Sequence, residues 1–407
     1  MTKKVSKKLK TVGLLLLLMA ALGAVLALRT RSLVGSKITD ARAEKLAQEV
    51  IKKCQGESYR PICYDEEVPK LMSSISMEDA FLVTKHIQNK DSSLDNCHIL
   101  AKKLSFEEAK RRPTDWKEII PRCPMNMCNY GCLHGAMIQH FRGEVLTDTQ
   151  IEEAIVDLKD VCEIKETYGR TDLDQTMCYH ALGHLAMYIT WGDPAKSIDI
   201  CEKVSKKEDG RDYHEICVEG AFMTVFQGVD EEDLALVRDI KPEKEGVRQF
   251  CSAYEGVNYE ACNRESYPLF REDMADPAKL VEFCSYVMGG HGIWKCYATG
   301  MGDVVVSMGI NDEVVGKVAS YCKRLPQSRV SQCFANVAVR LVQIDPKYQN
   351  YAVSLCEEAG RLGLEAECYR DMINFGEVAF NADSQERNSY CQSLGEKWHK
   401  RCLEGER

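Results

Sequence analysis

The sequence predicts an all-α protein: a solenoid of disulfide-stapled helical hairpins behind one N-terminal transmembrane helix. Three observations lead to this prediction. An apolar run of helical length lies near the start of the chain, 20 cysteines fall mostly into close pairs, and the later pairs recur at a regular period. The chain has 407 residues, a hydrophobic fraction of 45% and a net charge of −9. It can therefore bury a core, and it lacks the basic balance of a nucleic-acid partner, so we expect no nucleic acid to bind.

The N-terminal segment has the pattern of a membrane anchor. Lysines concentrate in residues 1–10, and an apolar run follows from Val12 to Leu28. A helix of that length rises about 25 Å, close to the thickness of a bilayer core. Because positive residues stay on the cytoplasmic side, we predict a cytoplasmic basic tail (1–10), a transmembrane signal-anchor (11–28) and a linker (29–40). A cleaved signal peptide is the alternative, and either arrangement places the bulk of the chain outside the cytoplasm, periplasmic or at the cell surface.

The cysteines form pairs that are close in the sequence. In an exported chain such cysteines oxidise to disulfides. Only Cys97 and Cys128 are left over after the close pairs are assigned, and they can pair with each other. A metal cluster of these two residues with Cys123, Cys132 and His134 is the alternative. The spacing predicts ten disulfides: Cys54–Cys63, Cys97–Cys128, Cys123–Cys132, Cys162–Cys178, Cys201–Cys217, Cys251–Cys262, Cys284–Cys296, Cys322–Cys333, Cys356–Cys368 and Cys391–Cys402.

A repeat becomes visible from Cys251 onward. The first cysteine of each pair recurs about every 35 residues, a period typical of stacked helix–turn–helix units. The residues repeat as well as the spacing. Asp-Pro-Ala-Lys occurs at residues 193–196 and again at residues 276–279, each time at the same distance before a cysteine. We therefore expect each repeat to be one hairpin of two helices.

Each hairpin should begin with a capped helix. Asp accepts a hydrogen bond from a free N–H of the first turn, and Pro lacks the N–H that would have no partner there. Asn311 and Asp345 are expected to cap equivalent helices. The first cysteine of a pair should end the first helix, and the second should open the next one. Small residues after it, such as Gly300, would allow neighbouring helices to approach closely.

In its period and hairpin plan, the chain resembles tetratricopeptide-like helical-hairpin repeat proteins. The Trp-Leu-Gly-Tyr pattern of that group is absent from the first helices, so the likeness concerns architecture alone. It implies a concave face that holds a protein or peptide. We predict a helical-repeat array over residues 151–407, preceded by an irregular helical-hairpin subdomain over residues 41–150.

The segment from residue 95 to 228 carries polar residues at helix starts, where later repeats carry small ones. His134, His180 and Glu219 each lie two places after a cysteine, and His184 lies one helical turn after His180. Hairpins stacked in register would align these residues in a row, with His98 at the start of an earlier helix. Imidazole and carboxylate groups suit Zn or Fe, so these five residues are the candidate metal ligands. A polar groove and a purely structural row are the alternatives.

Sequence motifs of common enzymes are missing. Gly-x-Ser-x-Gly, a phosphate-binding loop ending in Lys-Ser or Lys-Thr, and His-Glu-x-x-His do not occur, so no catalytic residue is predicted. We interpret the chain as a non-enzymatic extracytoplasmic scaffold, attached to the membrane through residues 11–28, with a protein or peptide partner. A metal-binding protein and a rigid structural component of the envelope are the alternatives.

Overall fold

The computed structural model describes residues 37–405, except 95, 125–126, 142–145, 164–170, 209–210, 229–230 and 288–289. In this part the chain is all-helical, as the sequence predicts, apart from a two-stranded hairpin of β1 (Lys207–Glu208) and β2 (Arg211–Asp212). No helix in the described part combines the length and apolarity needed to cross a membrane. The basic tail and the predicted anchor, residues 1–10 and 11–28, lie outside the described residues.

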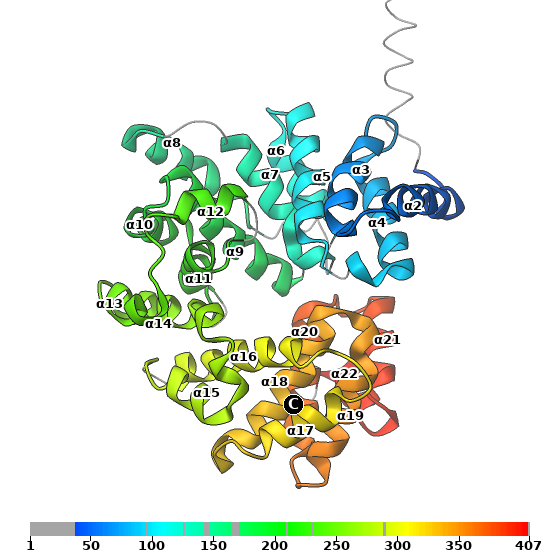
Figure 1. Ribbon diagram of the computed structural model, residues 1–407, viewed down its shortest axis with the longest axis vertical. Coiled ribbons are helices and arrows are strands. Elements are labelled where there is room, and N and C mark those ends of the chain that lie inside the picture. Colours follow the sequence, from blue (N-terminus) through cyan, green and yellow to red (C-terminus); the bar gives the residue numbers. More distant parts are fainter. Residues whose placement is uncertain are drawn as a thin grey trace, which may run out of the picture.

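The helices of the first half cross the upper part of the molecule, from right to left in Figure 1. They are α2 (Asp40–Cys54), α3 (Arg60–Leu71), α4 (Met77–Lys90), η1 (Ser92–Leu94), α5 (His98–Arg111), α6 (Trp116–Ile119), η2 (Ile120–Arg122), η3 (Cys128–Tyr130), α7 (Gly131–Phe141), α8 (Asp148–Leu158), α9 (Asp172–Ile189), α10 (Pro194–Val204), α11 (Tyr213–Phe226) and α12 (Glu231–Val237).

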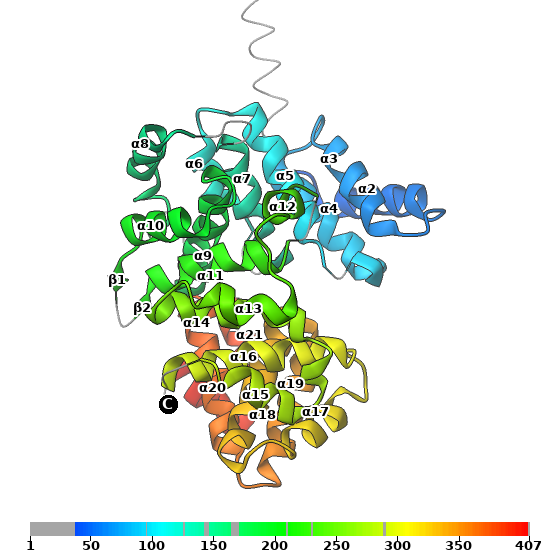
Figure 2. The ribbon, with the colours of Figure 1, turned by 60° about the vertical axis from the view of Figure 1, so that its left-hand side comes forward.

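The helices of the second half turn away from the first half and then back beneath it (Figures 1 and 2). They are η5 (Lys244–Gly246), α13 (Val247–Cys251), α14 (Gly256–Glu265), η6 (Tyr267–Phe270), η7 (Asp273–Ala275), α15 (Pro277–Cys284), α16 (Gly290–Ser307), α17 (Val314–Cys322), α18 (Gln327–Ile344), η8 (Pro346–Tyr348), α19 (Gln349–Gly360), α20 (Glu365–Ala379), α21 (Gln385–Ser393) and α22 (Glu396–Glu404).

Ten disulfides brace this array, and they join the same ten pairs that the cysteine spacing predicts. Most connect the end of one helix to the helix that follows. In the chain-entropy model, loops of this length give about 2–3 kcal/mol of stabilisation per disulfide. Disulfides at this density indicate an oxidising, extracytoplasmic environment.

The predicted helix caps are present, with two differences. Asp193 accepts hydrogen bonds from the first-turn N–H groups of α10, and Asp276 does the same for α15. Asp345 instead caps the short 3₁₀ turn η8, so α19 begins later, at Gln349. Asn311 accepts from the N–H of Glu313 in a turn that precedes α17. A short turn therefore stands between the polar residue and the α-helix in these two repeats.

The second cysteine of most pairs does not open its helix, which corrects the expectation from the sequence. Cys296 and Cys333 lie one to two turns inside α16 and α18. A disulfide requires Cα atoms about 4.4–6.8 Å apart, so the bond forms where two helices cross. The second helix can begin well before that crossing.

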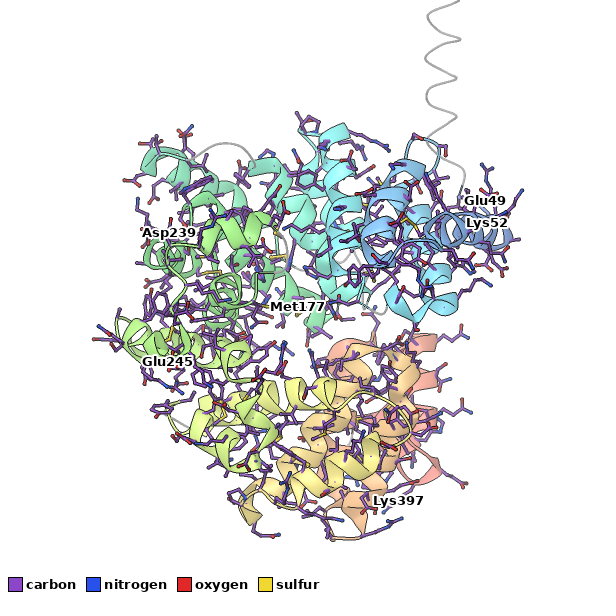
Figure 3. All side chains as sticks on the ribbon, viewed as in Figure 1. Glu49, Lys52, Met177, Asp239, Glu245 and Lys397 are labelled. Atoms are coloured by element: carbon purple, nitrogen blue, oxygen red, sulfur yellow. A yellow bond between two sulfur atoms is a disulfide. The ribbon has the colours of Figure 1, made fainter. Side chains whose placement is uncertain are left out.

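Buried apolar residues form two clusters. The first extends from Ala43 to Cys262 and the second from Met274 to Cys402. The clusters are brought together where α20 contacts α9, with Leu173 of α9 packing against the second cluster. Met177, also on α9, lies at the level where the upper and lower parts meet (Figure 3). The domain boundary predicted at residue 150 stays a prediction, because a hydrophobic cluster is not itself a domain.

Candidate functional site

The four candidate histidines lie together at the centre of the first half. His98 is the first residue of α5, His134 is on α7, and His180 and His184 are on α9. Their ring centroids are 4.9 Å apart for His98 and His134, 4.4 Å for His134 and His184, and 5.0 Å for His180 and His184. The histidine row therefore runs His98–His134–His184–His180. The α7 histidine contacts the second histidine of α9, one turn away from the partner expected from the sequence.

Glycines allow the helices that carry this row to touch backbone to backbone. A Cβ atom at Gly135 of α7 would lie 2.0 Å from the carbonyl oxygen of Lys102 on α5. A Cβ atom at Gly183 of α9 would lie 1.8 Å from the carbonyl oxygen of Cys217 on α11, and Gly220 faces α9 in the same way. The small residues following these cysteines thus bring α5 against α7 and α9 against α11.

Hydrogen bonds set the orientation of the rings. His98 donates from Nδ1 to the backbone carbonyl of Asn129 at 3.1 Å, since a carbonyl can only accept. The hydroxyl of Thr224 donates to the carbonyl of Gly220, which leaves its oxygen to accept from Nδ1 of His184 at 2.8 Å. The Nε2 atom of His184 therefore carries a lone pair rather than a proton.

Two imidazole nitrogens of the row are buried without a hydrogen-bond partner among the described residues. They are Nε2 of His134 and Nε2 of His184, and the side chain of His134 is buried. Burial, together with the neighbouring histidines and Lys102, lowers the pKa of both residues well below the usual histidine value. At neutral pH these rings are neutral and available as lone-pair donors.

Glu219, the fifth candidate, contributes to a different cluster. Its carboxylate lies 2.5 Å from Nη2 of Arg264 on α14 and 2.9 Å from Nζ of Lys295 on α16. Lys295 also binds Glu215 at 2.8 Å, and Arg264 binds its neighbour Glu265 at 3.3 Å. These five side chains form the buried ion network. It links α11 to α14 and α16, where the first half of the chain passes into the second (Figure 2).

The ion network contains two carboxyls with opposite pKa shifts. Burial raises the pKa of Glu265 to about 7, although Arg264 opposes this shift. Burial acts on Glu219 in the same sense, but Arg264 and Lys295 hold the pKa of that carboxyl below its usual value. A carboxyl that titrates near neutrality in a buried network is a candidate functional group.

A third polar group adjoins the histidine row. Nζ of Lys102, on α5, lies 3.3 Å from the hydroxyl of Tyr188 and 3.4 Å from a carboxylate oxygen of Asp233 on α12. Tyr188 also donates a hydrogen bond to Asp233. The lysine charge next to the row is therefore balanced by a carboxylate.

No sequence pattern predicts the ion network or the group at Lys102. Their partners are separated by 45 to 131 residues for the pairs Arg264–Glu219 and Lys102–Asp233. Only the packing of α5, α11, α12, α14 and α16 brings them together. The histidines could be found because their positions relative to the cysteines repeat from one hairpin to the next.

No metal-binding geometry is already formed among the described residues. No three His, Cys, Asp or Glu side chains in this part of the chain already converge as metal ligands. All cysteines are in disulfides, so no thiolate remains for the cluster considered at Cys123, Cys128 and Cys132.

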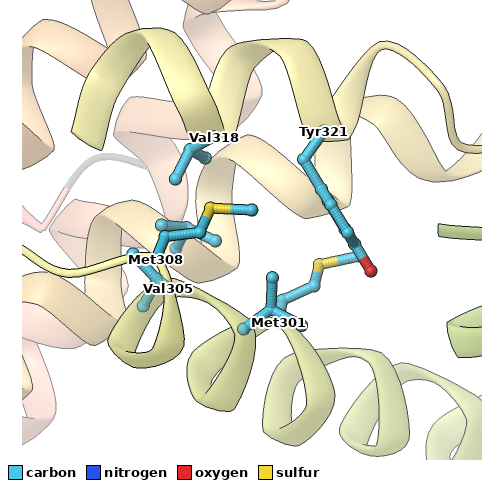
Figure 4. Close-up of a pocket in the computed structure, with 7 residues that line it drawn as sticks. Met301, Val305, Met308, Val318 and Tyr321 are labelled. Atoms are coloured by element: carbon cyan, nitrogen blue, oxygen red, sulfur yellow. The ribbon is translucent and has the colours of Figure 1, made fainter. Parts of the chain in front are cut away.

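A cavity of about 10 Å³ between α16, α17 and α18 is lined by Met301, Val304, Val305, Met308, Val318, Tyr321 and Val337 (Figure 4). It is small and apolar, and therefore suits neither a ligand nor a well-bound water.

Comparisons of the chain with protein-family models, with curated proteins and with solved structures find no match. The tetratricopeptide likeness therefore rests on the repeat period and the hairpin plan.

Proposed function

We propose that the chain is a membrane-anchored extracytoplasmic scaffold whose solenoid of helical hairpins binds a protein or peptide. The observation that carries this proposal is the serial bracing of successive hairpins by their own disulfides. Each bond fixes the crossing of two helices. A surface built from such hairpins is rigid before a partner arrives, so little conformational entropy is lost on binding.

Anchoring is supported by the sequence of residues 11–28 and by the lysines that precede it. The same orientation places the cysteines in an oxidising compartment, where the ten disulfides can form and persist. A tethered scaffold would present its hairpins to partners at the membrane surface.

An exposed tryptophan supports a protein or peptide partner. Trp191 follows α9, is 69% exposed, and has a left-handed backbone with φ 57°. Glycine is the usual residue at this position after a helix, and another side chain there costs about 1–2 kcal/mol. The adjoining Gly192 packs against Leu236 of α12, whose Leu234 is 50% exposed. Tryptophans are enriched among residues that dominate binding energy, so Trp191 and Leu234 are the proposed partner contacts.

The test is site-specific photo-crosslinking in the cells that make the protein. A photoreactive amino acid at Trp191 or Leu234 of the full chain should give one discrete crosslinked protein. The same amino acid at Val156, which is 72% exposed on α8, is the matched control and should give none. The crosslinked protein, once purified, should bind the full chain saturably, and Trp191→Ala should weaken binding at least about 10-fold.

The alternative hypothesis, a rigid structural component of the envelope, makes the opposite prediction. It requires no discrete crosslink at Trp191 or Leu234 beyond what Val156 gives. That result, or a captured protein that binds wild type and Trp191→Ala equally well, would overturn the scaffold proposal at this surface.

A further inference from the structure

We infer that His98, His134 and His184 form a binding site for a first-row transition-metal ion, with imidazole nitrogens as its protein ligands. This inference goes beyond the scaffold function and does not depend on it. It begins from the two buried Nε2 atoms of His134 and His184 that have no hydrogen-bond partner in the described structure. A buried polar atom left without a partner costs about 1–3 kcal/mol, and here two such atoms belong to rings in contact.

The hydrogen bonds around the row orient lone pairs toward an ion. Metal-binding imidazoles almost always donate their other ring N–H to a carbonyl or another fixed acceptor. His98 does so to Asn129, and His184 does so to Thr224, whose own hydroxyl is held by Gly220. The Nε2 atoms of His134 and His184 both remain without a hydrogen-bond partner in the described structure. An electron-pair acceptor between them satisfies both.

The spacing of the rings suits one ion. Because a Zn–N bond is about 2.0–2.1 Å, two imidazoles on one tetrahedral ion have ring centres about 5 Å apart. The ring centroids of His98 and His134 are 4.9 Å apart, and those of His134 and His184 are 4.4 Å apart. The nitrogens do not yet converge on one point. Ion binding therefore requires rotations about χ2, a broad torsion in histidine, that bring the nitrogens together.

The surroundings can accommodate the charge of an ion. Lys102 lies beside the row, but Asp233 balances its charge. Glu219 is engaged by Arg264 and Lys295, so the protein donors are neutral. His98 and His184 are half-buried, which leaves room for water or an anion as a further ligand. His180, whose centroid is 5.0 Å from that of His184, is next to the site.

The donor set indicates which ions to use. Imidazole ligands suit Zn²⁺ and Cu²⁺, and affinity rises along the series to Cu²⁺, with Fe²⁺ binding less tightly. Zn²⁺ is the probe for stoichiometry and affinity. Cu²⁺ is the probe for ligand identity, because its paramagnetic resonance spectrum shows splitting from coordinated nitrogen.

The first experiment titrates the oxidised full chain, purified in detergent without a histidine tag and stripped by a chelator, with Zn²⁺ against a chromogenic competitor. We expect one equivalent to bind with a submicromolar Kd. His134→Gln and His184→Gln should each weaken binding at least about 10-fold, the loss typical of altered metal surroundings. His86→Gln is the matched control, because His86 pairs with Asp40 on another surface, and it should leave the Kd unchanged.

The second measurement identifies the ligands. The Cu²⁺ spectrum of wild type should show several coordinated nitrogens, and His184→Gln should show fewer. Circular dichroism and non-reducing mobility report whether each variant folds. If the buried His134→Gln fails to fold, the half-buried His98→Gln and His184→Gln carry the test. Binding weaker than about 10 μM, or equal binding by His184→Gln and His86→Gln, would overturn the inference and leave the row as a packing feature. No partner is involved, so this failure is distinct from failure of the scaffold proposal.

Discussion

Arg264 is a fully buried charge at the junction between the two halves of the chain. Its side chain is 2% exposed and lies among Glu215, Glu219 and Glu265, with Lys295 completing the network. A charge can be buried at this depth only when its partners are fixed around it. The network therefore specifies how α11, α14 and α16 sit against one another.

Removing that charge should be strongly destabilising. Arg264→Met keeps much of the side-chain volume but leaves three buried carboxyls with Lys295 alone. We expect a loss of about 3–5 kcal/mol in the free energy of unfolding, because the remaining charges lose their partner. Urea unfolding of the oxidised chain measures it. The control is Lys196→Met, which breaks an exposed ion pair with Asp148 and should change the stability little, because solvent screens exposed charges. Equal losses would show that the network does not hold the junction.

The raised pKa of Glu265 predicts a pH dependence of stability. Its pKa rises from 4.5 to about 7 on folding, chiefly through burial. The folded state then binds more protons than the unfolded state between these values, so this contribution to stability is lost as pH rises. The buried histidines, whose pKa values are lowered, act in the opposite sense. The comparison is therefore between wild type and Glu265→Gln.

The melting temperature of wild type should fall relative to that of Glu265→Gln as pH rises from 4.5 to about 7. The glutamine keeps an acceptor for the amide of Gln227, which binds Glu265 at 3.0 Å, and cannot ionise. Differential scanning calorimetry across this range checks the prediction. Parallel curves would mean that Glu265 does not titrate there.

At the scale of helices, glycine contacts set the spacing of the central pairs. Gly183→Ala would place a Cβ atom 1.8 Å from the carbonyl oxygen of Cys217 and force α9 and α11 apart. We expect it to destabilise the chain by about 1–3 kcal/mol, the usual cost of overpacking. Gly316→Ala is the matched control, since Gly316 is inside α17 with no atom near a Cβ. It should stabilise by about 0.5–1 kcal/mol. Thermal unfolding separates the two signs, and a stabilised Gly183→Ala would contradict the close-contact explanation.

The sequence predicted helices better than it predicted how they meet. Caps at Asp193 and Asp276 were readable because local backbone chemistry determines them. Near Asn311 and Asp345 the α-helices begin later than the sequence predicts. The reason is that a 3₁₀ turn or a bend can accept the same capping hydrogen bond as an α-helix. The histidine row was visible through its repeated distance from the cysteines. The actual neighbour of His134 depends on an offset of one turn between α7 and α9, which tertiary packing decides.

At the scale of the whole molecule, two descriptions make different predictions. In a solenoid, each hairpin depends mainly on its neighbours, and stability is close to a sum of local terms. The contact between α20 and α9 departs from such nearest-neighbour behaviour, because it joins a helix late in the chain to an early one. How far a local lesion spreads through the chain distinguishes a one-dimensional array from a single cooperative unit.

Removing the last disulfide tests this difference. Cys391→Ala with Cys402→Ala opens the bond between α21 and α22, which pack against α19, α20 and each other. We expect local stability there to fall by about 2–3 kcal/mol. Hydrogen exchange should then lose protection over residues 385–404, while α9 and α11 keep theirs.

The control removes a disulfide from the middle of the array. Cys201→Ala with Cys217→Ala loosens α10 against α11, and α11 packs against both α9 and α14. Exchange should therefore increase on both sides of the lesion, in α9 and in α14. If instead the terminal pair of substitutions lowered protection equally in α9, α11 and α21, the chain would unfold as one unit. The contact of α20 with α9, rather than the stacking of neighbours, would then govern its stability.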